Sequence, residues 1–133
     1  MNKNPIATWH QIAKDRNASG LDTLLADNVV FLSPVVHTPQ VGKTITKAYL
    51  SAALLVLNNE TFHYVREIVG ERDAVMEFES VIDGITINGV DLIQWNDAGQ
   101  ITEFKVMVRP LKAVNMLHQK MAAMLQSHAS KAA

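Results

Sequence analysis

The sequence contains no cysteine, and this absence excludes several kinds of chemistry. Disulfide bonds, thiolate metal ligands and a nucleophilic thiol all require that residue. Histidine is scarce as well, and none of the five pairs with another at metal-ligand spacing beside a carboxylate. We therefore expect no metal site and no cofactor.

Long apolar runs and an excess of one charge are also missing. No stretch approaches the roughly 20 apolar residues of a membrane-spanning helix. Twelve basic and thirteen acidic side chains give a formal net charge of -1. Nucleic acids and anionic membranes are bound mainly through clustered positive charge, so we expect neither as a partner. The N-terminal residues lack an apolar core of signal-peptide length, which predicts a cytoplasmic protein.

The composition that remains is that of a globular protein. Hydrophobic residues make up 48% and charged residues 19% of a 133-residue chain, which fits one domain with a real core. We expect that domain to span residues 1–126. Residues 127–133 are small and polar at a terminus, which predicts a frayed tail.

Helix signals dominate the first half of the chain. Asn4 and Pro5 form a cap followed by proline, and the next apolar residues recur at three- and four-residue spacing. Ser19 and Thr44 are expected to cap two further helices, the second running to about Asn58. A short β-branched and aromatic run at 29–32 predicts a strand between them.

Strand signals dominate the second half. Short turns separate four strand-like runs, and short turns require antiparallel pairing. These runs are 62–69, 74–82, 85–95 and 101–108. A last amphipathic helix follows Pro110. Helices before a meander indicate an α+β fold, in which a strongly curved, mostly antiparallel sheet wraps the helices as a cone with an apolar interior.

Two segments carry a resemblance to a known family. Residues 25–31, followed by Pro34 and Gly42, resemble the front half of the nuclear transport factor 2-like superfamily, and residues 90–101 resemble its penultimate hairpin. That superfamily includes ketosteroid isomerases, SnoaL-like polyketide cyclases, limonene epoxide hydrolases and proteins without catalytic activity. The resemblance implies the cone fold and a pocket, but no particular reaction.

Asp91 is the first candidate for a catalytic residue. It lies in an apolar, β-branched run, and an inward carboxyl in such surroundings has a raised pKa. The resemblance aligns it with the oxyanion-hole aspartate of ketosteroid isomerases, which stays neutral and donates a hydrogen bond to the enolate. Alternatively, Asp91 faces outward or satisfies a backbone group. His37, in the loop between Pro34 and Pro39, is a second candidate acid or base.

The rest of the isomerase site is not matched. The resemblance implies a general-base aspartate where Ser33 stands and a hydrogen-bonding tyrosine where Trp9 stands. A serine hydroxyl is far too weak a base to move the proton unaided, which puts steroid-type proton transfer in doubt. Tyr49 aligns with a supporting tyrosine of that family. The helical histidines His10, His118 and His128 are read as exposed positions.

Two other interpretations fit the sequence less well. An epoxide hydrolase needs two carboxylates and an arginine around one water, but strand alternation puts Glu77 and Glu79 on the face opposite Met76. The residues 42–44 suggest a phosphate-binding loop. His37 stands where that motif requires its first glycine, so the loop is discarded.

We therefore expect a SnoaL-like pocket protein that binds an apolar carbonyl compound, with Asp91 as its polar anchor and isomerisation or cyclisation without a cofactor as its possible chemistry. The alternative is a non-catalytic binding or dimerisation module. The remaining expected pocket residues are Trp9, Phe31, Ser33, Tyr49, Leu54, Met76, Phe78, Ile93, Trp95, Phe104 and Val106. A homodimer is expected through the outer sheet face, which carries Glu77, Glu79, Lys105, Met107 and Arg109.

Overall fold

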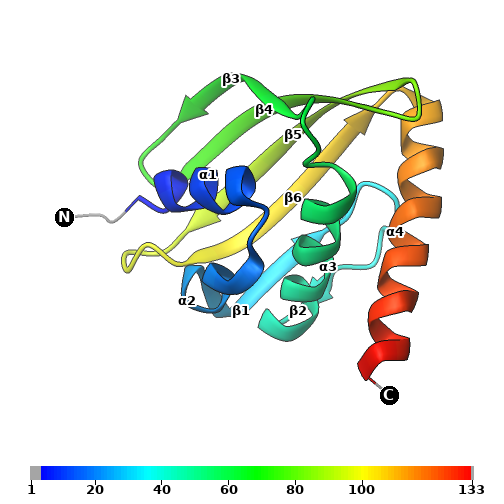
Figure 1. Cartoon of the computed structure of the whole chain (residues 1–133). Helices are drawn as coiled ribbons and strands as arrows, with labels where there is room; N and C mark the ends of the chain where they lie inside the picture. The colour runs from blue at the N-terminus through cyan, green and yellow to red at the C-terminus, as the bar shows by residue number, and fades with distance from the viewer. Residues whose placement is uncertain (1–3, 133) are drawn as a thin grey trace.

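One six-stranded sheet frames the molecule in a computed structural model that describes residues 4–132, with side chains described as far as Ser127 (Figure 1). In chain order the elements are α1 (Ile6–Asp15), the 3-10 turn η1 (Ala18–Gly20), α2 (Leu21–Leu24), β1 (Leu25–Leu32), β2 (Gln40–Val41), α3 (Lys43–Val56), β3 (His63–Val69), β4 (Asp73–Ile82), β5 (Ile85–Trp95), β6 (Ile101–Arg109) and α4 (Leu111–Ala132).

The strand order is β2-β1-β6-β5-β4-β3. Strands β3 to β6 form an antiparallel meander, whereas β1 runs parallel to β6 and so joins the first half of the chain to the second. This arrangement confirms the predicted α+β class with a mostly antiparallel sheet and an extra C-terminal helix.

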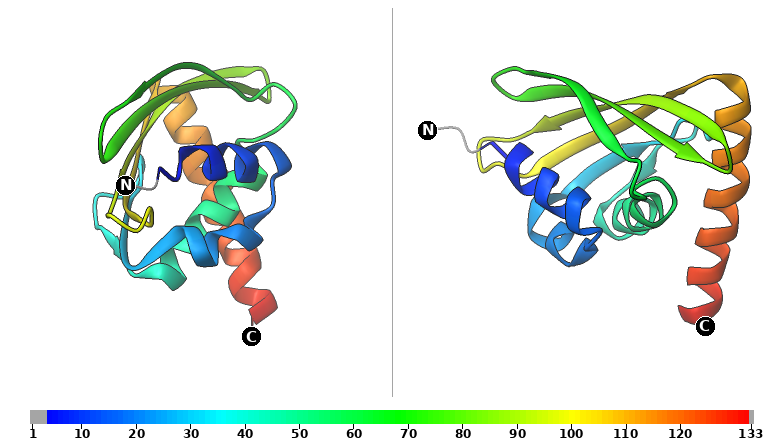
Figure 2. Two further views of the ribbon diagram at one scale, coloured as in Figure 1. Left: turned by 90° about the vertical axis from the view of Figure 1, so that its left-hand side faces the viewer. Right: turned by 45° about the horizontal axis from the view of Figure 1, so that its top comes forward.

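Helices lie on one face of the sheet only. Figure 2 shows α1, α2 and α3 inside its curve, while no described helix covers the other face. The core fills the space between them, because inward side chains of every long strand meet the apolar stripes of the helices. Its largest fully buried side chains include Phe31, Phe78, Phe104, Leu21, Leu25, Leu50 and Leu54.

Several element boundaries differ from the sequence prediction. β1 begins at Leu25 rather than at residue 29, since Leu25 is buried and pairs with Ile101. The N-cap of α3 is Gly42 at a φ of 108°, not Thr44. α4 follows Pro110, as predicted, and its backbone runs to Ala132.

α4 stands across one end of the sheet, where it packs against α3 and β6 (Figure 1). None of the described helices is long and apolar enough to cross a membrane.

Candidate ligand-binding site

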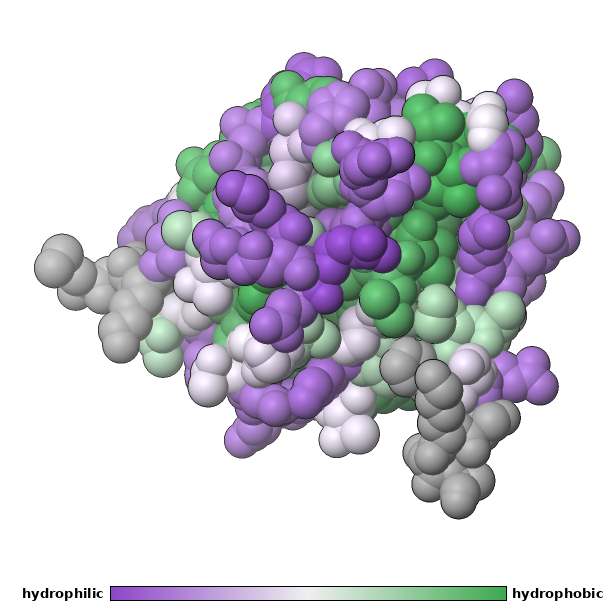
Figure 3. Space-filling model, viewed as in Figure 1, coloured by the Kyte–Doolittle hydropathy of each residue, from purple (hydrophilic) through white to green (hydrophobic). Residues whose placement is uncertain are grey.

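A cavity of about 140 Å³ lies under α4, at the open end of the cone. Figure 3 shows an apolar strip on the surface between α3 and α4. Its wall is made of Phe31, Ser33, Pro34, Val35, Val36, Tyr49, Ala53, Leu57, Val106, Leu117, His118, Met121, Ala122 and Leu125. Nearly all of this surface is hydrocarbon, so the cavity favours an apolar occupant.

Each element contributes one face to the wall. On α3, Tyr49 and Ala53 are four residues apart and therefore stand one above the other. On α4, Leu117, Met121 and Leu125 repeat the same spacing. The end of β1 turns sharply at Ser33, whose Oγ accepts hydrogen bonds from the backbone N–H groups of residues 35 and 36 at 3.1 and 3.3 Å. This turn brings the loop after β1 over the cavity.

Three polar side chains interrupt the apolar wall: Ser33, Tyr49 and His118. The Tyr49 ring packs on Phe31 with centroids 5.3 Å apart. Among the described residues, neither the Tyr49 hydroxyl nor the His118 ring has a hydrogen-bond partner. His118 is exposed, as the sequence predicted, but it also contributes to the rim of the cavity, which the sequence did not predict. The side chain of His128 lies outside the described residues.

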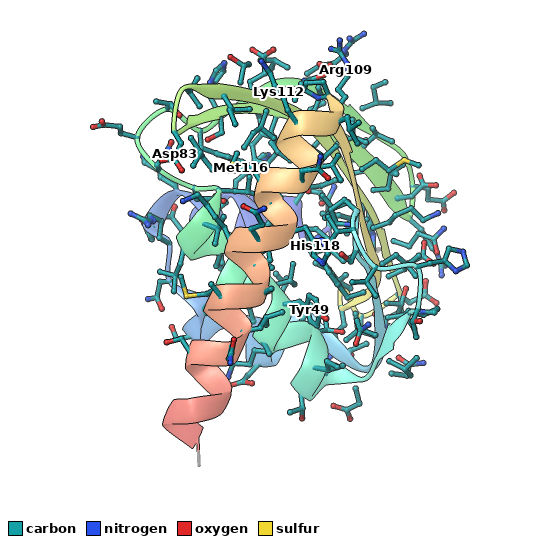
Figure 4. All side chains as sticks on the ribbon, turned by 90° about the vertical axis from the view of Figure 1, so that its right-hand side faces the viewer. Tyr49, Asp83, Arg109, Lys112, Met116 and His118 are labelled. Carbon is teal, nitrogen blue, oxygen red and sulfur yellow. The ribbon has the colours of Figure 1, made fainter. Side chains whose placement is uncertain are left out.

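Figure 4 shows how the two rings approach this end of the molecule. Tyr49 comes from α3 and His118 from α4, and both lie on the side of α4 that faces the loop after β1. The cavity thus has three hydrogen-bonding side chains in a wall that is otherwise mostly hydrocarbon.

Four of the predicted pocket residues line this cavity, namely Phe31, Ser33, Tyr49 and Val106. The other seven fill the interior behind it, where aromatic rings pack on one another; the Trp9 and Phe104 centroids, for example, are 4.9 Å apart. The deep part of the cone is therefore closed by its own side chains. These seven are Trp9, Leu54, Met76, Phe78, Ile93, Trp95 and Phe104.

Asp91 points inward from β5 and is 5% exposed. Its Oδ2 accepts a hydrogen bond from the Tyr64 hydroxyl at 2.8 Å, and that hydroxyl accepts one from Trp9 Nε1 at 2.8 Å. Burial raises the pKa of Asp91 to about 7, although the Tyr64 hydrogen bond acts in the opposite direction. Asp91 is therefore an acid that is protonated for part of the time at neutral pH.

The sheet register places Asp91 directly beside the cavity. Its partners across the neighbouring strands are Met76 and Val106, and Val106 is part of the cavity wall. Paired residues share one face of a sheet, so the carboxyl lies one side chain behind the wall. Asp91 itself does not line the cavity.

Tyr64 is the residue that sequence reasoning missed: the resemblance pointed to Tyr49 as a supporting tyrosine, whereas the tyrosine that contacts Asp91 is Tyr64. Burial and the nearby Asp91 raise the pKa of Tyr64 well above its ordinary value, so its hydroxyl keeps its proton and donates it. Tyr64 pairs with the buried Phe78 and therefore faces inward, but the register shift that follows Tyr64 hides this orientation from the alternation of residues along β3.

The other candidates lie away from Asp91. His37 is exposed and borders a different hollow, beside β6. Arg109 donates to Asn88 at 3.4 Å, and Glu77 pairs with Arg66 at 3.0 Å, both on the outer face of the sheet. An epoxide-hydrolase arrangement around Asp91 is therefore not formed. Among the side chains that the structure describes, no three histidine or acidic residues gather as metal ligands would.

Two solved structures combine coverage of most of both chains with at least 30% sequence identity. A steroid delta-isomerase from Pseudomonas aeruginosa is 34% identical, with a TM-score of 0.89 over 94% of this chain and 91% of that one. An uncharacterized protein with a cystatin-like fold from Silicibacter pomeroyi is 30% identical, with a TM-score of 0.86 over 94% and 87%.

A nuclear transport factor 2-like protein of unknown function from Mesorhizobium loti shares the fold. It is 19% identical, with a TM-score of 0.69 over 79% of this chain and 88% of that one. Neither a scan against models of protein families nor a comparison with curated proteins found a match.

Proposed function

Because this chain belongs to the nuclear transport factor 2-like superfamily, we propose that it binds a small apolar carbonyl compound in the cavity beneath α4. The observation that carries the proposal is the cavity itself, an apolar chamber with three hydrogen-bonding side chains in its wall. The Ser33 oxygen already accepts two N–H groups, so its hydrogen is left to donate, and the Tyr49 hydroxyl is also a donor. Donors on an apolar wall suit a ligand with a carbonyl oxygen.

The size of the cavity limits the ligand. A cavity of about 150 Å³ lined by aliphatic and aromatic side chains binds benzene. At about 140 Å³, this cavity accommodates a single ring or a short chain. A four-ring steroid is several times larger and does not fit while α4 keeps this position. The ligand is therefore a smaller carbonyl compound than the name of the Pseudomonas aeruginosa relative implies for that protein.

The chemistry that this site supports is cofactor-free isomerisation or cyclisation. Such a reaction develops negative charge on the carbonyl oxygen, which a neutral acid stabilises by hydrogen bonding. Asp91 is the buried acid among the described residues, and it pairs across the sheet with Val106, which lines the cavity. In this proposal Asp91 anchors the ligand after a small displacement of the wall.

A non-catalytic binding or dimerisation module is the second candidate. It is favoured by the hydrogen-bonded chain from Trp9 through Tyr64 to Asp91, which satisfies the buried acid without any ligand. The two candidates differ in whether Asp91→Asn affects ligand binding or only the stability of the fold. Homodimerisation and a cytoplasmic location remain predictions.

Thermal denaturation against a panel of cyclic ketones, lactones, phenols and short fatty acids tests the binding. A ligand at about 100 times its dissociation constant stabilises the protein by roughly 2.7 kcal/mol, which moves the unfolding midpoint measurably. Ala122 and Ala123 are neighbouring exposed alanines on α4, but only Ala122 lines the cavity. Ala122→Phe should therefore abolish the ligand-dependent shift, while Ala123→Phe preserves it.

Two results would overturn the proposal. One is the absence of a shift with every compound, which would leave the non-catalytic module. The other is an equal shift in wild type and Ala122→Phe, which would place the ligand elsewhere. A shift that survives Asp91→Asn unchanged would remove only the anchoring role of Asp91.

A further inference from the structure

We propose that the hollow between α1 and β3 is a second binding site, which takes a small aromatic carboxylate with an N–H donor at the opposite end of its ring. The wall of this hollow comes from the second half of α1, the segment that joins α3 to β3, and the start of β3. Its volume is about 330 Å³, and none of the described residues that line it also lines the cavity beneath α4. In Figure 1, α1 and β3 lie on the left and α4 on the right.

Asn58 supplies an unused hydrogen-bond acceptor at the floor of the hollow. The residue is 8% exposed, and its Nδ2 donates to the backbone oxygen of Ala13 at 3.2 Å. Its Oδ1 accepts no hydrogen bond from any described residue. Because a carbonyl oxygen in a buried side chain costs free energy when it has no partner, this atom favours a ligand whose N–H group reaches it.

Lys14 supplies a free positive charge at the rim. Its side chain is exposed, and it forms no ion pair and no hydrogen bond with the described residues. Two carboxylates approach this wall, but each is paired with one of its histidines. Glu67 contacts Nε2 of His10. Glu79 lies 3.7 Å from Nε2 of His63. The Lys14 ammonium therefore remains available for an anionic group, and a carboxylate is the acceptor that suits it.

Aromatic rings form the apolar side of the hollow. Phe62 is stacked on the buried Phe78 with centroids 5.3 Å apart, and Tyr64 meets Phe62 edge to face at 5.2 Å. The His10 ring packs edge-on against Tyr64, with centroids 5.0 Å apart. These contacts hold the rings of the wall in place. Because aromatic pairs are stabilised beyond the area that they bury, this wall favours an aromatic ligand over an aliphatic one.

The depths of the two polar groups set the orientation of the ligand. Asn58 is buried and Lys14 is exposed, so the N–H donor enters first and the carboxylate stays at the rim. The ring between them lies against Phe62. A dry cavity of about 150 Å³ holds benzene, so this larger hollow takes one ring together with a substituent at each end. The cavity beneath α4 has no lysine or arginine among its described wall residues, so the two sites select different ligands.

Titration calorimetry with 4-aminobenzoate tests the site, because this compound has the ring, the carboxylate and the opposite N–H donor. Benzoate lacks the donor, so the wild type should bind it about fivefold more weakly. Lys14→Gln should weaken binding of 4-aminobenzoate about fivefold, the effect of losing one exposed charge contact. The same substitution should leave binding of the uncharged 4-aminobenzamide unchanged. Lys112→Gln is the matched control, since Lys112 is also an exposed helical lysine but lies on α4 outside the hollow.

Ala122→Phe separates this site from the cavity beneath α4. The variant should bind 4-aminobenzoate as the wild type does, while Lys14→Gln keeps the thermal shift produced by a ketone in the cavity. Three results would overturn the inference. The first is that the wild type shows no saturable binding of 4-aminobenzoate by calorimetry or ligand-observed NMR. The second is that Lys14→Gln binds it as tightly as the wild type, or that benzoate binds equally well. The third is that Ala122→Phe abolishes its binding, which would place the compound beneath α4.

Discussion

Tyr64 connects two buried polar groups that would otherwise lack partners. Its hydroxyl donates to Asp91 and accepts from Trp9 Nε1, each at 2.8 Å. Tyr64→Phe keeps the ring but leaves both groups unpaired in the core. Because an unsatisfied buried group costs roughly 1–3 kcal/mol, we expect the variant to lose about 3 kcal/mol of unfolding free energy.

Denaturant unfolding measures this loss, as a lower midpoint with an unchanged slope. The matched control is Tyr49→Phe, which removes a hydroxyl that has no partner among the described residues and should cost little. Equal stabilities of the two variants would show that the hydroxyl of Tyr64 contributes nothing in the core.

Asp91 makes the stability of the fold depend on pH. Burial raises its pKa from 3.8 to about 7, so the folded protein binds this proton more tightly than the unfolded chain does. The stabilisation that comes from the tightly bound proton of Asp91 is fully present below about pH 4. It decreases as the pH rises towards 7 and does not change further above that pH. The shift corresponds to a loss of about 4 kcal/mol across this window.

Asp91→Asn removes this titration, so its stability relative to the wild type should increase from pH 4 to pH 7. Urea unfolding at several pH values measures the difference between the two proteins, in which the effects of all other groups cancel. Asp73→Asn, at an exposed carboxyl, should keep the wild-type profile. Parallel profiles of wild type and Asp91→Asn would contradict the assignment of the raised pKa.

The sequence predicted Asp91 in the interior but not its partner. Alternation along β5 is regular, which suffices to turn Asp91 inward. Tyr64 is 27 residues away, and the pairing of β3 with β4 shifts between Tyr64 and Arg66. A register shift of this kind reverses the faces of the residues beyond it, and local alternation does not reveal it. Hydrogen bonds across strands therefore required the structure.

At the scale of elements, the close packing of β4, β5 and β6 depends on Gly89. A Cβ atom at this position would lie 2.5 Å from Cζ of Phe78 and 2.7 Å from the carbonyl oxygen of Met107. The Phe78 ring thus lies over the glycine. Gly89→Ala must displace either the ring or the backbone of β6, so we expect a loss of about 2 kcal/mol.

Thermal unfolding measures this loss, and Gly20→Ala is the control. Gly20 has a φ of -76°, and a Cβ atom there would meet the Ile12 side chain, at 3.1 Å from Cδ1 and 3.3 Å from Cγ1, and no backbone atom. The control should therefore remain near wild-type stability. A Gly89→Ala variant as stable as the control would show that the sheet accommodates a methyl group without strain.

The elements themselves were largely predictable, whereas the surface that α4 covers was not. The spacing of its apolar residues predicted a helix after Pro110 that packs against the rest of the domain. The surface that α4 covers depends on where β6 ends, and the parallel pairing of β6 with β1 sets that position. For this reason the sequence offered His37 as a candidate acid or base and read His118 as simply exposed, while the structure puts His118 on the cavity wall.

At the scale of the whole molecule, the outer sheet face is the surface without a covering layer. The register aligns apolar side chains across it: Ile68 beside Val75, and Val75 beside Leu92. In the next row Val90 lies beside Met107, and exposed fractions of 63% for Ile68 and 55% for Met107 leave apolar surface in water. An apolar row bordered by charged residues favours a two-fold contact with a second copy.

We therefore expect a dimer in solution, with twice the 14.7 kDa mass of one chain, and Met107 in its contact. Met107→Lys puts a charge opposite its own copy across the two-fold axis, and burying that charge without a partner costs more than the contact gains. Light scattering at micromolar concentration should then give the mass of a monomer. Leu111→Lys is the control, because Leu111 is even more exposed, at 74%, but begins α4 outside the sheet. If the Met107→Lys variant remained dimeric, the dimer contact would lie on another face. If the wild type were monomeric, this face would be exposed to solvent and the dimer prediction would be wrong.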